Sequence, residues 1–120
     1  IDIRIHPHSL KIYADPNLFG QVVLNLMKNA IQAMQGQPQG NLSILATTDP
    51  LTNRVQVKIS DNGPGIPAEI INEIFVPFFT TKNEGSGIGL SIARQIMRAH
   101  NGNIKVSSVP HQETTFTLSF

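Results

Sequence analysis

The sequence has no cysteine, few charges and no long apolar run, and each absence excludes a class of protein. Without cysteine, the chain has no disulfide framework, no thiolate nucleophile and no cysteine-based zinc site. Only 14% of the residues are charged and the net charge is +1, which disfavours nucleic acid and anionic lipid as partners. No apolar run approaches the roughly 18 residues that a membrane span needs. We therefore expect a cytoplasmic location, whether or not the parent protein is membrane-anchored.

The length of the chain fits a single domain. Its 120 residues are enough for one hydrophobic core and leave no room for a second. The chain opens in a strand pattern at Ile1-Asp2-Ile3. We expect residues 1–120 to be one domain excised from a longer protein, and a monomer when isolated.

The spacing of apolar residues predicts alternating helical and extended segments. Asp15 reads as an N-cap and Pro16 as the first helical residue, and Gly36 is a fitting stop for this helix. Apolar residues then alternate over 42–46 and 55–59, which predicts a hairpin. A short helix over 68–74, a helix over 90–100 and strands over 104–106 and 116–120 follow. One-sided strands and amphipathic helices predict an α+β fold, a two-layer sandwich with helices on one face of a mostly antiparallel sheet.

Two asparagines lie one turn apart on the first predicted helix. Asn25 and Asn29 share a face beside the apolar stripe. The two residues are either ordinary surface asparagines or functional residues. Asparagine is a poor helix former, so the pair lowers the stability of the helix. A neutral amide oxygen suits Mg²⁺, which binds through few protein groups plus phosphates.

A carboxylate occupies the core face at the end of the second hairpin strand. Asp61 follows Val55, Val57 and Ile59 with the same parity, and a buried carboxylate is costly unless it is hydrogen-bonded. It is either a turn aspartate or a carboxylate at a pocket floor that accepts a hydrogen bond from an amine such as that of adenine. Gly63 and Gly65 then free the backbone for a close approach.

A second glycine-rich stretch precedes the second long helix. Residues 85–90 read Gly-Ser-Gly-Ile-Gly-Leu, and backbone N–H groups exposed before a helix N-terminus suit an anion. The stretch matches neither the dinucleotide fingerprint nor the Walker loop. Alone it is weak evidence of phosphate binding.

In this order, the segments resemble the ATP-binding catalytic domain of bacterial sensor histidine kinases. The wider superfamily (GHKL) includes gyrase B, heat-shock chaperones and mismatch-repair ATPases. Residues 25–30 resemble the family's N box, 61–67 its G1 box and 85–90 its G2 box. Residues 75–82 resemble the F box in the form found in nitrogen-regulation and sporulation kinases. His100-Asn101-Gly102 is similar to the usual His-Gly-Gly.

The resemblance implies a Bergerat-type fold, with about five strands covered by about three helices, that binds ATP and Mg²⁺. Asn29 would hold the metal with Asn25 assisting, Asp61 would bind the adenine amino group, and Gly65 would let the base pack against the backbone. Residues 83–87 would belong to a short lid. The other expected nucleotide neighbours are Gln32, Ala33, Gly63, Ile66, Phe75, Thr80, Thr81, Lys82, Gly85, Ser86, Gly87, Ile88, Gly89, Leu90 and Thr114.

Two positions depart from the family's pattern. Gln32 stands where many relatives carry lysine, and Glu113 stands where glycine usually opens Gly-Thr-x-Phe. The second change bears on the turn that precedes Thr114.

The resemblance also separates the possible activities. Hydrolases and serine-directed kinases of the superfamily carry a glutamate base where this chain has Asn25; an amide is no base, whereas a neutral imidazole is already nucleophilic. We therefore expect phosphoryl transfer to a histidine outside this chain, on a dimeric helical phosphoacceptor domain, with a response regulator acting downstream. A pure ATPase or nucleotide-controlled switch is the alternative, and a nucleotide-free interaction module is a third.

Overall fold

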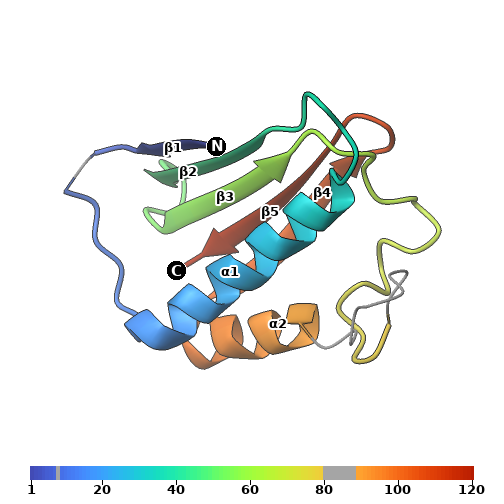
Figure 1. Ribbon diagram of the computed structural model, residues 1–120. Coiled ribbons are helices and arrows are strands. Elements are labelled where there is room, and N and C mark those ends of the chain that lie inside the picture. Colours follow the sequence, from blue (N-terminus) through green and yellow to red (C-terminus); the bar gives the residue numbers. More distant parts are fainter. Residues whose placement is uncertain (8, 80–88) are drawn as a thin grey trace.

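The computed structural model describes residues 1–7, 9–79 and 89–120. Seven elements follow one another: β1 (Asp2–Ile5), α1 (Pro16–Ala33), β2 (Leu42–Thr48), β3 (Val55–Asp61), α2 (Gly89–Ala99), β4 (Asn103–Val109) and β5 (Glu113–Ser119). Figure 1 shows both helices on the same face of the sheet. The predicted α+β, two-layer architecture is confirmed.

The five strands form one mixed sheet in the order β1-β2-β3-β5-β4. β1 pairs with β2 in parallel, and the other three pairs are antiparallel. β2 and β3 form the predicted hairpin. β5, the last strand in the chain, lies between β3 and β4, so the end of β3 is flanked by a strand far from it in sequence.

Helix α1 begins where the Asp-Pro signal predicts. The Asp15 side chain accepts hydrogen bonds from the backbone N–H groups of Asn17 and Leu18, at 2.8 and 3.1 Å, and so satisfies donors that the first turn leaves free. After Met34, Gly36 takes a positive φ of 80°, a conformation that glycine adopts without strain. Helix α1 buries Val22, Leu26 and Ala30.

The core fills the space between the helices and the sheet. The inward residues of β3 and β5 alternate with outward polar ones, and Leu118 is fully buried. Rings meet edge to face at Phe19–Phe120 and Phe75–Phe116. The buried apolar residues are Val22, Leu26, Ala30, Leu42, Val57, Ile59, Ile74, Ala93, Ile96, Met97, Ile104, Phe116 and Leu118.

The short helix expected over 68–74 does not form, and the structure has two helices in its described part where about three were expected. Separate turns follow one another instead. Each is closed by a backbone N–H that donates to the carbonyl three residues earlier, and the donors are Ile70, Glu73, Val76 and Phe79. A helix this short has little stability of its own, and Pro77 disfavours a helical Val76. Neither α1 nor α2 is long and apolar enough to cross a membrane.

Because β5 is an interior strand of the sheet, its buried side chains should contribute strongly to the stability of the domain. Replacing the fully buried Leu118 by alanine should lower the free energy of unfolding by about 2–5 kcal/mol, because transfer and cavity costs add. Urea unfolding measures the change. Leu51, which is 93% exposed, gives the control: Leu51→Ala should leave the midpoint nearly unchanged. Equal effects of the two substitutions would contradict this core.

Candidate functional site

The Asp61 carboxylate lies on the helix-covered face of the sheet, as its parity predicts. Asp61 is the last residue of β3, where it pairs with Leu42 of β2 and Thr114 of β5. The residue is 7% exposed. Its Oδ1 accepts a hydrogen bond from the backbone N–H of Gly63 at 2.9 Å, which stabilises the charged form and fixes the direction of the carboxylate.

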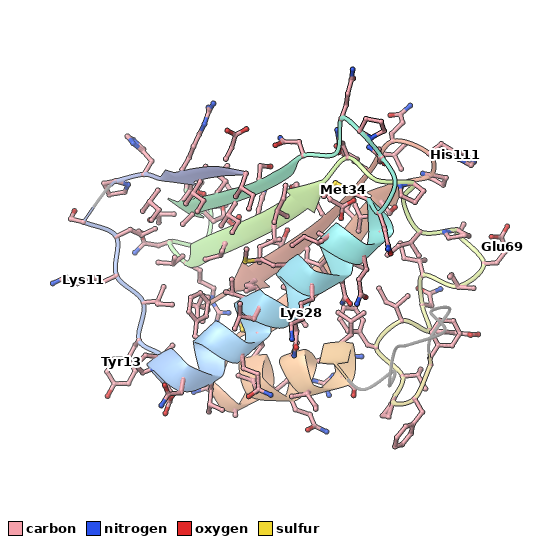
Figure 2. All side chains as sticks on the ribbon, in the orientation of Figure 1. Lys11, Tyr13, Lys28, Met34, Glu69 and His111 are labelled. Atoms are coloured by element: carbon pink, nitrogen blue, oxygen red, sulfur yellow. The ribbon has the colours of Figure 1, made fainter. Side chains whose placement is uncertain are left out.

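Gly63 joins this carboxylate to the end of α1. A Cβ atom at Gly63 would lie 2.8 Å from Asp61 Oδ1, 3.3 Å from Met34 Cγ and 3.6 Å from Ala33 Cβ. Figure 2 shows Met34 at the end of α1 nearest the sheet. Because a Cβ at this position would press on both the Asp61 carboxylate and the Met34 side chain, only glycine lets the chain pass between them.

The β4–β5 turn holds the segment that follows Asp61. The backbone N–H of Ile66 donates to Ser108 Oγ at 2.7 Å, and the N–H of His111 donates to the carbonyl of Pro64. Gly65 has a φ of 76°, and a Cβ there would meet the Val109 carbonyl at 2.6 Å. This close approach accounts for the glycine; its expected contact with a base stays a prediction.

Two polar side chains hold the other side of the same segment. Asn62 Oδ1 accepts from the backbone N–H of Asn41 at 2.7 Å, and Asn62 Nδ2 donates to the Gln39 carbonyl at 3.0 Å. Gln37 Nε2 donates to the Asn62 carbonyl at 2.8 Å. The sequence analysis missed these residues and Ser108; only their polarity beside turn formers signalled them.

Asn25 faces the start of α2, and Asn29 lies one turn further along the same flank of α1. Asn25 Nδ2 donates to the Gly89 carbonyl, at the start of α2, at 3.4 Å. Both Asn25 and Asn29 are half-buried. Ala33 is eight residues after Asn25, a rise of about 12 Å along the helix. One flank of α1 thus connects the N-terminal end of α2 to the Asp61 carboxylate, with Asn29 between them.

Other expected residues have structural contacts of their own. The Phe75 ring packs against Phe116 with 6.3 Å between ring centroids, and the Arg94 guanidinium lies 5.5 Å from its centroid. Thr114 is buried, with its hydroxyl 3.3 Å from that of Ser108. The turn before Thr114 forms with His111 at a positive φ of 67°, and Glu113 is the first residue of β5.

Two more of the expected residues, Gln32 and Leu90, lie in the described part of the chain. Gln32 is exposed and lines a cavity of about 480 Å³ at the end of α1; the other lining residues are Ile31, Met34, Gln35, Gln37 and Gly40. Leu90, in the first turn of α2, is half-buried. Outside the described residues lie Thr80, Thr81, Lys82, Gly85, Ser86, Gly87 and Ile88, together with the rest of the expected lid.

Comparisons with known proteins identify the family of the chain. The profile of the family described as histidine kinase-, DNA gyrase B-, and HSP90-like ATPase matches residues 14–120. The chain is 44% identical over 108 residues to the sensor histidine kinase ZraS of Escherichia coli K12, covering 90% of this chain and 22% of ZraS. It is 40% identical to sporulation kinase A of Bacillus subtilis over 112 residues, covering 93% and 18%. The chain therefore spans about a fifth of the length of these relatives.

Solved structures share the fold over nearly the whole chain. The nucleotide-free catalytic domain of histidine kinase ThkA superposes with a TM-score of 0.82 at 32% identity, covering 98% of this chain and 76% of that one. The mycobacterial sensor histidine kinase MprB gives a TM-score of 0.84 at 26% identity, covering 99% and 80%. With four motifs in the family's order and this fold, the chain belongs to the histidine kinase-, DNA gyrase B- and HSP90-like ATPases, as a histidine kinase catalytic domain.

Proposed function

We propose that this domain binds ATP with Mg²⁺ and transfers the γ-phosphoryl group to a histidine on a separate, dimeric helical domain. The observation that carries the proposal is the flank of α1. A buried hydrogen-bond acceptor, Asp61, lies at one end; Gly89, at the start of α2, lies at the other; and Asn29 lies between them. A nucleotide needs the same order of contacts, with base recognition at one end and phosphate binding at the other.

Asp61 is suited to select adenine. An ionised carboxylate only accepts hydrogen bonds, and the exocyclic amine of adenine is a donor. Since Gly63 N–H already engages Oδ1, the carboxylate is oriented before the base arrives. A base with a carbonyl at that position would place two acceptors together and would bind poorly.

The donor set of α1 fits Mg²⁺. This ion takes oxygen ligands, keeps several waters and is commonly held by one or two protein groups together with substrate phosphates. The Asn29 amide oxygen is such a ligand, and Asn25 beside Gly89 supports the same end of the site. No group of three histidine, aspartate or glutamate side chains suitable for a metal occurs in the described part of the chain. The ion would neutralise charge on the phosphates.

The residue at position 25 favours histidine as the phosphoryl acceptor. The amide of Asn25 donates to the Gly89 carbonyl, and an amide cannot remove a proton from water or from a serine hydroxyl. A neutral imidazole needs no such base. The domain would then act by holding the triphosphate in position for the incoming imidazole. It would work in the cytoplasm, where its direct partner is the acceptor helix. A response regulator would act after that helix.

The transfer can be tested with the isolated chain. We expect it to bind ATP·Mg²⁺, to incorporate negligible radiolabel itself, and to phosphorylate its acceptor domain when the two are mixed. Stoichiometric label on His6, His8, His100 or His111 would contradict the proposal. Steady ATP hydrolysis without an acceptor would favour the nucleotide-controlled switch instead, and failure to bind ATP would favour an interaction module.

The adenine contact can be tested by removing one charge. Asp61→Asn should raise the dissociation constant for ATP by about 10- to 100-fold, since hydrogen bonds to a charged group contribute roughly 1.5–3 kcal/mol. Isothermal titration calorimetry measures the change. Asp2→Asn, on an exposed strand, is the matched control. Unchanged affinity of the Asp61 variant would refute this role.

The tight packing at Gly63 gives an independent test of the same pocket. In Gly63→Ala, the new Cβ would lie 2.8 Å from Asp61 Oδ1, so the carboxylate must move and ATP affinity should fall by at least about tenfold, or 1.4 kcal/mol. Gly20→Ala introduces the same methyl group into open space on α1 and should leave affinity unchanged. Equal affinities of the two variants would show that the position of this carboxylate does not matter.

A further inference from the structure

The ring of His100 bonds to two helices at once. Its Nε2 lies 3.1 Å from the backbone nitrogen of Asp15, the N-cap of α1, and its Nδ1 lies 2.8 Å from the carbonyl oxygen of Ile96 in α2. A backbone N–H only donates, so Nε2 must accept. The proton is therefore on Nδ1, where it is donated to Ile96, and the ring is the neutral Nδ1–H tautomer.

The turn after α2 fixes the place of this ring. Asn101 takes a φ of 57°, and the N–H of Gly102 donates to the Met97 carbonyl at 2.8 Å, which closes the end of the helix. A Cβ at Gly102 would collide with the carbonyl of Ser119. The end of α2 is thus packed directly against the end of β5, and His100 is held facing α1.

Helices α1 and α2 are joined by side chains at both ends of their contact. The Asp15–His100 hydrogen bond lies at the C-terminal end of α2, and the Asn25–Gly89 hydrogen bond lies at its N-terminal end. Between them runs an 11-residue helix, about 16 Å long. Ala93, Ile96 and Met97 keep α2 in the core, and the two hydrogen bonds at its ends then set the position of this short helix along α1.

We infer that His100 is a positioning residue for the triphosphate end of the site. The inference rests on the proposed function, in which the start of α2 meets the phosphates while Asn29 of α1 holds the metal. His100 touches neither group. Through α2, it sets the distance between Gly89 and Asn29.

This role predicts an effect confined to the phosphates. The adenine end depends on Asp61, the last residue of β3, and on Gly63, whose N–H donates to it. Ser108 of β4 holds the segment that follows them. No part of α2 supplies those contacts. Loss of the His100 acceptor should therefore weaken binding of ATP and leave binding of adenosine unchanged, whereas general destabilisation would not separate the two ligands.

The experiment compares three variants by titration calorimetry with ATP·Mg²⁺ and with adenosine. His100→Leu removes the acceptor and should raise the dissociation constant for ATP by about 2- to 12-fold, the range expected for one neutral hydrogen bond. His100→Gln places an amide oxygen at the same reach and should restore ATP affinity. His6→Leu, at an exposed histidine, is the control and should match the parent chain.

Nitrogen chemical shifts of the His100 ring provide a readout that needs no ligand. We expect the shifts of an Nδ1–H tautomer, with Nε2 unprotonated. An Nε2–H tautomer would overturn the inference whether or not the chain binds nucleotide. If His100→Leu lost affinity for ATP and for adenosine in the same proportion, that result would overturn it as well. If the leucine variant does not fold, weak ATP binding by a folded His100→Gln decides against the role. Failure of the parent chain to bind ATP would instead overturn the proposed function and the inference that rests on it.

Discussion

The site depends on keeping one carboxylate buried without leaving its charge unsatisfied. Burial of an ionised group costs several kcal/mol unless hydrogen bonds compensate. Asp61 obtains its compensation locally, because the chain turns immediately and returns the N–H of Gly63 to Oδ1. This turn leaves no space for a side chain at position 63. The requirement for glycine at position 63 therefore comes from the carboxylate itself.

Much of this fold is readable from local patterns. The Asp15-Pro16 start of α1, the β2–β3 hairpin and the inward face of Asp61 follow from capping chemistry and from parity, which act over a few residues. The error at 68–74 has the same origin. Apolar spacing there is compatible with a helix, but Pro67 and Pro77 limit its length. A helix that short is no more stable than a series of separate turns.

The residues that support the site could not be read in this way. Ser108 and His111 reach Ile66 and Pro64 across more than forty residues of chain, and Gln37 reaches Asn62 from a loop that looks featureless in sequence. These contacts depend on strand order. β5 lies between β3 and β4, and this brings the β4–β5 turn beside the end of β3. The role of His100 likewise depends on the antiparallel packing of two distant helices.

The place of β5 between β3 and β4 has a consequence for synthesis on the ribosome. Residues 113–119 are the last strand to emerge, yet they supply the partner of β3 along Gln56 to Asp61 and the fully buried Leu118. Until they emerge, one edge of β3 has backbone N–H and C=O groups without a partner strand, and these can pair with another nascent chain. The sheet of this domain therefore closes only after residues 113–119 have been made, however early β3 leaves the ribosome.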